Sequence, residues 1–150
     1  SFYNQYERFI SYSRFVSREY SYDELSNLVD IINEPRPEGS QTTILKLYGL
    51  GGKVSEINKN DTAFYYRDSN YIISIESDFE DNEYKKDNYK WLEEKSKYIY
   101  DITEGSYINF PYYPLDNYLY EYYGDNYKYL QRINRKYNPL NTFGFQQSIR

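Results

Sequence analysis

The strand-like and helix-like segments of this chain do not alternate as they do in a parallel α/β fold. Aromatic and β-branched residues predict strands at residues 9–16, 42–48 and 71–77, with a further short strand at 54–57. Helical apolar spacing follows the first strand and returns only after the strand at 71–77. This order favours an α+β fold in which helices cover one face of an antiparallel sheet.

The helices are predicted from apolar spacing together with start and stop signals. Ser21 and Glu24 have the spacing of a capping box, and Gly105 stands where a C-terminal helix cap is expected. Leu130 and Ile133 are expected to turn inward from the last helix. The predicted helices begin after residue 21 and then span residues 83–103, 116–123 and 126–137.

The length of 150 residues suits one domain with a core of its own. No internal repeat or linker divides the chain, so we expect a single domain over residues 1–150. Its sheet and covering helices are expected in residues 1–104, and a C-terminal helical segment in residues 105–150. The first residues lack the features of a signal peptide and the chain contains no Met, which suits a processed or excised fragment.

Composition narrows the chemistry that is open to the chain. The absence of Cys and His removes disulfides, thiol nucleophiles, the Ser-His-Asp triad and most zinc sites, and no metal site is predicted. A net charge of −5 argues against nucleic-acid binding, and no apolar run is long enough to span a membrane. The 23 Tyr residues reflect compositional bias, because Tyr, Asn, Ile and Lys are abundant together, and a tyrosine can replace Phe or Leu at half-buried positions. Compartment is not indicated.

Three motifs that could carry chemistry give no specific evidence for it. The glycines at 49–52 lack the phosphate-loop spacing and predict a turn. The acidic residues at 78–83 lack the spacing of a calcium loop and suit a helix N-terminus. Among so many acids, Asp116 and Glu121 give no distinct signal of a catalytic carboxylate pair.

The aromatic loop at residues 106–111 is the segment most unlike an ordinary connection. Tyr107, Asn109 and Phe110 lie in it, and loops of this kind often carry function. Aromatic rings around an amide suit a planar ligand. The alternative is a loop that packs onto the domain through its rings, and the residue pattern leaves both possibilities open.

Several short segments occur in the order and spacing of one known family. Together they resemble the C-terminal, substrate-side region of berberine-bridge-enzyme-like FAD-linked oxidases, closely over residues 42–150 and loosely before that. The matching segments are Gly-Gly-Lys-Val at 51–54, Thr-Ala-Phe-Tyr-Tyr-Arg at 62–67, Tyr-Ile-Asn-Phe at 107–110, Tyr-Tyr-Gly-Asp-Asn at 122–126, Lys-Tyr-Asn-Pro-Leu-Asn-Thr-Phe at 136–143 and Gln-Ser-Ile at 147–149.

The resemblance implies a two-part enzyme whose FAD-binding domain is absent from this chain. That N-terminal domain, which holds FAD, is then the expected partner, together with a small-molecule substrate. Tyr107 matches a tyrosine that helps to take a proton from the substrate hydroxyl, and Asn109 matches a residue that lies against the flavin, with Phe110 beside it. The chain alone is expected to hold no flavin and to be inactive.

The resemblance also implies a substrate-facing side of the sheet. Ile72, Ser74 and Glu76 match that face, and Tyr48 is expected to look into the same cavity. The residues at 65–66, 72, 74, 78–79 and 110 depart from the common family pattern, so substrate identity does not transfer. The expected function is the C-terminal part of an oxidoreductase that oxidises an alcohol, sugar or related carbinol. The alternatives are a non-catalytic carbohydrate or small-ligand binding module, and a degenerate relative that is kept for structure.

Overall fold

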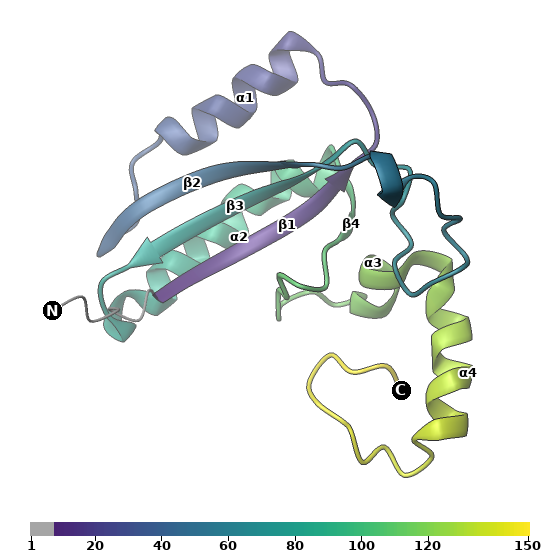
Figure 1. Ribbon diagram of the computed structural model, residues 1–150. Helices are drawn as coiled ribbons and strands as arrows, with labels where there is room; N and C mark the ends of the chain where they lie inside the picture. Colours follow the sequence, from purple (N-terminus) through teal and green to yellow (C-terminus); the bar gives the residue numbers. More distant parts are fainter. Residues whose placement is uncertain (1–7) are drawn as a thin grey trace, which may run out of the picture.

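A computed structural model describes residues 8–150 and contains one four-stranded antiparallel sheet. The N-terminal residues that were considered above for signal-peptide features lie outside this range. The strand order is β2-β3-β1-β4, and Figure 1 views the sheet from the face opposite the long helix. The strands are β1 (Arg8–Val16), β2 (Ser40–Gly49), β3 (Tyr71–Phe79) and β4 (Glu104–Ser106). The predicted α+β class is confirmed.

Four α-helices accompany the sheet: α1 (Tyr22–Asn33), α2 (Lys85–Asp101), α3 (Tyr118–Tyr123) and α4 (Tyr127–Tyr137). The predicted capping box starts α1, since Ser21 Oγ accepts from the backbone N–H of Glu24 at 3.3 Å and the Glu24 carboxylate accepts from the N–H of Ser21 at 2.9 Å. In the part of the chain that the structure describes, no helix combines the length and apolar character that crossing a bilayer requires.

The core lies between the sheet and the helices that cover one of its faces. Ile73 and Ile75 of β3 are fully buried there, against Leu92 and Ile99 of α2. Helix α1 adds Leu28 and Ile31 to the same cluster. Because successive side chains of a strand point to opposite faces, Ile72, Ser74 and Glu76 of β3 lie on the other face of the sheet.

The strand predicted at residues 54–57 is wrong. A 3₁₀ turn, Gly52–Val54, occupies the start of this stretch, and turns and bends follow it. Gly51 and Gly52 have φ angles of 138° and 53°, which fold the chain sharply back after β2. A glycine adopts such angles without steric cost, so the local backbone overrides the apolar pattern of Val54 and Ile57.

Two details at the helix ends also differ from expectation. Gly105 does not cap α2 but lies inside β4 with φ 57°, because the chain turns straight into a short strand beside β1. Ile133 is 37% exposed and does not face a core. Helix α4 and the tail after it extend away from the sheet (Figure 1), and no residue of α4 is buried in the part of the chain that the structure describes.

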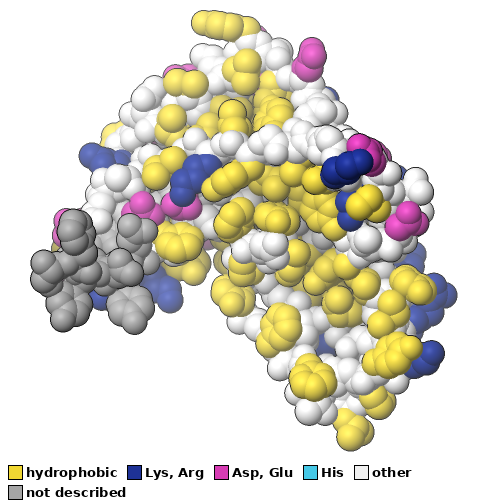
Figure 2. All heavy atoms as spheres, in the orientation of Figure 1, with side chains coloured by type: hydrophobic (Ala, Val, Ile, Leu, Met, Phe, Trp, Pro, Cys, Tyr) yellow, Lys and Arg dark blue, Asp and Glu magenta, His cyan; other side chains and the backbone are white. Residues whose placement is uncertain are grey.

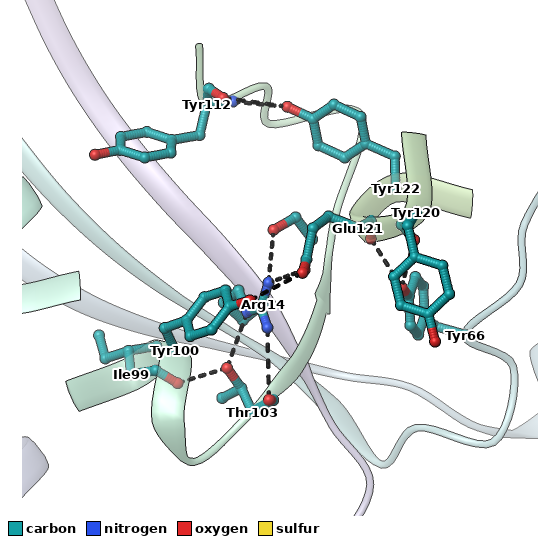
Figure 3. Close-up of polar contacts among 10 residues, drawn as sticks. Arg14, Tyr66, Ile99, Tyr100, Thr103, Tyr112, Tyr120, Glu121 and Tyr122 are labelled. Atoms are coloured by element: carbon teal, nitrogen blue, oxygen red, sulfur yellow. Dashed lines mark hydrogen bonds and ion pairs between the residues drawn. The ribbon is translucent and has the colours of Figure 1, made fainter. Parts of the chain in front are cut away.

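A buried ion pair joins the sheet to the C-terminal segment. The Arg14 guanidinium of β1 contacts the Glu121 carboxylate of α3, with only 3% and 11% of the two side chains exposed. Arg14 also donates to the hydroxyls of Thr103 at 3.0 Å and Ser106 at 3.2 Å, and it lies 4.4 Å from the ring centroid of Tyr100 (Figure 3). The network therefore ties β1, β4, the end of α2 and α3 to one another.

Replacing Arg14 with Met should destabilise the protein by about 3–5 kcal/mol, because it leaves the Glu121 carboxylate buried without its cation. Urea-induced unfolding followed by far-UV circular dichroism measures the loss. The double variant Arg14→Met/Glu121→Met should recover much of it. Lys53→Met, which breaks the exposed pair with Glu56, should leave the midpoint nearly unchanged. Equal losses from Arg14→Met and Lys53→Met would contradict the role given to the buried pair.

Candidate functional site

The face of the sheet that the helices leave uncovered carries the predicted site residues. Strand register places Lys46, Ser74 and Ser13 in one row across β2, β3 and β1 of this open face, and Tyr48, Ile72 and Phe15 in the next row. Figure 2 shows the open face with hydrophobic side chains gathered where the sheet meets the C-terminal segment, and with basic and acidic side chains together over the strands.

Tyr107 enters the open face directly after β4. Its backbone N–H donates to the carbonyl of Ser13 at 3.2 Å, and its ring packs edge-on against Phe15 at a centroid distance of 5.8 Å. The Asn109 amide Nδ2 donates to the Tyr107 hydroxyl at 2.8 Å. The structure therefore brings together Tyr107 and Asn109, whose predicted roles stay predictions.

Phe110 carries the loop across the sheet toward its far edge. The chain turns at residues 107–110, where the Phe110 N–H donates to the Tyr107 carbonyl at 3.0 Å. The Phe110 ring then stacks on Tyr48 of β2 with centroids 5.8 Å apart. Tyr48 remains 39% exposed, so an aromatic wall stands open beside the loop.

The predicted substrate-facing residues of β3 are not equally accessible. Ile72 is only 4% exposed because Phe15 and Tyr66 pack around it. Ser74 is 2% exposed, and its hydroxyl accepts from Ser13 Oγ at 2.8 Å. Glu76 is more accessible, with 14% of its side chain exposed.

Glu76 forms an ion pair that the sequence analysis did not single out. Its Oε1 lies 2.6 Å from Lys46 Nζ, across β3 and β2, with 14% of the Glu76 side chain and 34% of the Lys46 side chain exposed. The hydrogen bond to Glu76 is the main cause that raises the pKa of Lys46 above its usual value. Strand alternation from Tyr48 already put Lys46 on this face, and that signal could have drawn attention to it.

A recess of about 360 Å³ opens beside Tyr107. Phe15, Phe64 and Tyr123 contribute rings to its walls, and Asn109 contributes an amide at its edge. An apolar wall with a polar edge fits a conjugated ring system such as the isoalloxazine of FAD, which stacks through its face and forms hydrogen bonds at its rim. The residues present therefore fit the expected cofactor.

Tyr66 and Gly105 support the loop from beneath, and sequence reasoning missed both roles. The Tyr66 hydroxyl donates to the carbonyl of Glu121 at 2.8 Å, and its ring stacks on Phe15 at 4.4 Å. Burial raises the pKa of Tyr66 well above its usual value, so it stays a neutral donor. The Tyr66 ring covers Gly105 so closely that a Cβ there would overlap it.

Comparison with known proteins supports the resemblance noted for the loop at residues 106–111 and for the segment that follows it. Residues 106–150 match the family model described as berberine and berberine like. An uncharacterized FAD-linked oxidoreductase of Bacillus subtilis, YgaK, is 34% identical over 100 residues, which is 67% of this chain and 22% of that relative. The chain belongs to the berberine-bridge-enzyme-like family.

Two further proteins also resemble this chain over most of its length. A carbohydrate oxidase of Microdochium nivale is 29% identical over 109 residues, which is 68% of this chain and 22% of that protein. The oxidoreductase GilR, solved in complex with pregilvocarcin, superposes with a TM-score of 0.86 and 26% identity, over 96% of this chain and 33% of that one. The chain thus spans about a fifth of the length of the curated relatives it matches.

Gly105→Ala should displace β4 and the loop that follows it, because the backbone there has φ 57° and the Tyr66 ring occupies the space of a Cβ. Hydrogen–deuterium exchange of residues 104–112 should accelerate by at least about tenfold. Gly49→Ala is the matched control, because no atom lies within 4 Å of a Cβ there. Unchanged exchange in Gly105→Ala would mean that the Tyr66 contact does not hold the loop.

Proposed function

We propose that this chain forms the substrate-side wall and the flavin-facing loop of an FAD-dependent oxidoreductase that oxidises an alcohol, sugar or related carbinol. The observation that carries the proposal is the Asn109 amide donating to the Tyr107 hydroxyl at 2.8 Å, beside a recess whose rings suit a flavin. Family membership and relatives that are FAD-linked oxidoreductases support it.

In the proposed reaction, Tyr107 is the catalytic base. FAD, when bound, would supply the acceptor for the hydride of the substrate carbon. The Tyr107 oxygen takes the proton of the substrate hydroxyl, while its own proton passes to water. The N–H of Asn109 stabilises negative charge on that oxygen and aims the phenol, so Asn109 is a positioning residue for Tyr107.

The proposed partner is an N-terminal FAD-binding domain of the same protein. The C-terminal segment exposes large apolar side chains that soluble proteins usually cover, namely Leu140 at 87%, Phe143 at 80% and Phe145 at 66%. Helix α4 and this tail project together from the sheet (Figure 1). The FAD-binding domain is the proposed cover for that surface.

Co-expression of this chain with such an N-terminal domain should give a yellow complex with the visible absorption of an oxidised flavin. Phe143→Ser should lower the amount of flavin retained, because it removes an anchor that is 80% exposed on this chain alone. Tyr22→Ser is the matched control, since Tyr22 is 84% exposed on α1, which lies beside β2, at the other edge of the sheet from β4 and α3. A complete protein that never retains flavin would contradict the proposed function.

Tyr107→Phe in the flavin-loaded protein should lower kcat by roughly 10²- to 10⁴-fold while flavin content stays unchanged. Anaerobic stopped-flow reduction of the flavin measures the step directly. Tyr113→Phe, which alters an exposed tyrosine of the same loop region, should leave the rate unchanged. Normal reduction in Tyr107→Phe would remove Tyr107 from the reaction.

The second candidate function is a non-catalytic carbohydrate-binding module. The observation that favours it is the Tyr48–Phe110 stack, which leaves an exposed aromatic face at the open side of the sheet. Aromatic faces of this kind pack against the C–H face of a sugar ring. Glycan-array binding by the chain alone, lost in Tyr48→Ala, together with no flavin in the complete protein, would favour this reading.

A further inference from the structure

The Lys46–Glu76 pair is the one ion pair on the open face beside the aromatic wall, among the residues that the structure describes. Lys46 precedes Tyr48 by two positions on β2, so the two side chains share a face and are neighbours along the strand. Three features therefore lie side by side: a cation, an anion and an aromatic ring.

The two groups hold each other in place but keep further hydrogen-bonding capacity. Lys46 Nζ donates one N–H to Glu76 Oε1, which leaves two further donors on the ammonium group. The second carboxylate oxygen of Glu76 keeps its acceptor capacity. With 34% of the Lys46 side chain and 14% of the Glu76 side chain exposed, both groups remain reachable from the open face of the sheet.

The opposite charges of Lys46 and Glu76 cancel, and this determines which class of ligand the pair can bind. An anionic ligand gains from Lys46 but is repelled by Glu76, and a cationic ligand meets the reverse. Two adjacent hydroxyl groups on a ring meet neither penalty, because one accepts from the ammonium while the other donates to the carboxylate. Hydrogen bonds to charged partners are the stronger ones, so the pair discriminates well for such a group.

We propose that Lys46 and Glu76 together determine specificity by binding a vicinal diol of a neutral, ring-shaped substrate whose apolar face lies on Tyr48. This inference rests on the proposed function, since it places that substrate on the same open face of the sheet as Tyr107. Neither residue takes part in bond breaking: Lys46 and Glu76 orient the ring, and Tyr107 accepts the proton.

The test uses the complete flavoprotein and two probes, a neutral cyclic sugar with a free vicinal diol and its monodeoxy analogue. Wild-type protein should prefer the diol by roughly 10- to 100-fold in kcat/KM. Lys46→Met and Glu76→Gln should each reduce that preference to nearly one, mainly by raising KM for the diol. The charge-reversed double variant Lys46→Glu/Glu76→Lys should regain part of it, because the donor and the acceptor return in exchanged places.

Arg18→Gln is the matched control, because Arg18 pairs with Glu24 at the start of α1 and not with Lys46 or Glu76, so the change should leave the preference unaltered. Equal kcat/KM for the two sugars in wild type, or a preference that survives Lys46→Met and Glu76→Gln, overturns the inference while the oxidase function stands. If neither sugar reduces the flavin, calorimetric binding decides: selective binding of the diol that both variants abolish supports the inference, and equal or absent binding overturns it.

Discussion

The buried pair between Arg14 and Glu121 is the contact on which the placement of the site depends. An unpaired buried charge is costly, so β1 and α3 must approach each other in the one arrangement that neutralises both groups. Ser106 belongs to the same network and immediately precedes Tyr107. The helix side of the sheet therefore fixes where the loop of the open side begins, and with it the position of the Tyr107 hydroxyl.

Strand β3 shows how one segment serves both a core and a site. Ile73 and Ile75 are fully buried against the helices, while Glu76 turns to the open face and meets Lys46. Alternation along the strand makes the two demands independent. A substitution of Glu76 can therefore alter the open face without a change in the core packing on which the fold depends.

Patterns that are local in sequence predicted much of this structure, and contacts distant in sequence account for most of what was missed. The capping box and the three long strands follow from spacing alone. Arg14 and Glu121 are 107 residues apart, and no local feature connects them. Alternation placed Ile72 and Ser74 on the open face, but it carries no information about Phe15 and Tyr66, which bury Ile72 there.

The prediction that Ile133 of α4 faces inward was wrong for a related reason, because the local pattern of a helix does not show what packs against it. Its apolar pattern is real, yet Ile133 has no core to enter among the described residues, because the helix extends away from the sheet. The tail nevertheless returns to the body: Gln147 donates to the carbonyl of Tyr112 at 3.0 Å and accepts from the Tyr122 hydroxyl at 2.9 Å. Tyr112 closely follows the loop that carries Tyr107 and Phe110. In the proposed enzyme, covering the exposed face of this segment would therefore steady that loop as well, which would make docking of the FAD-binding domain and assembly of the site one event.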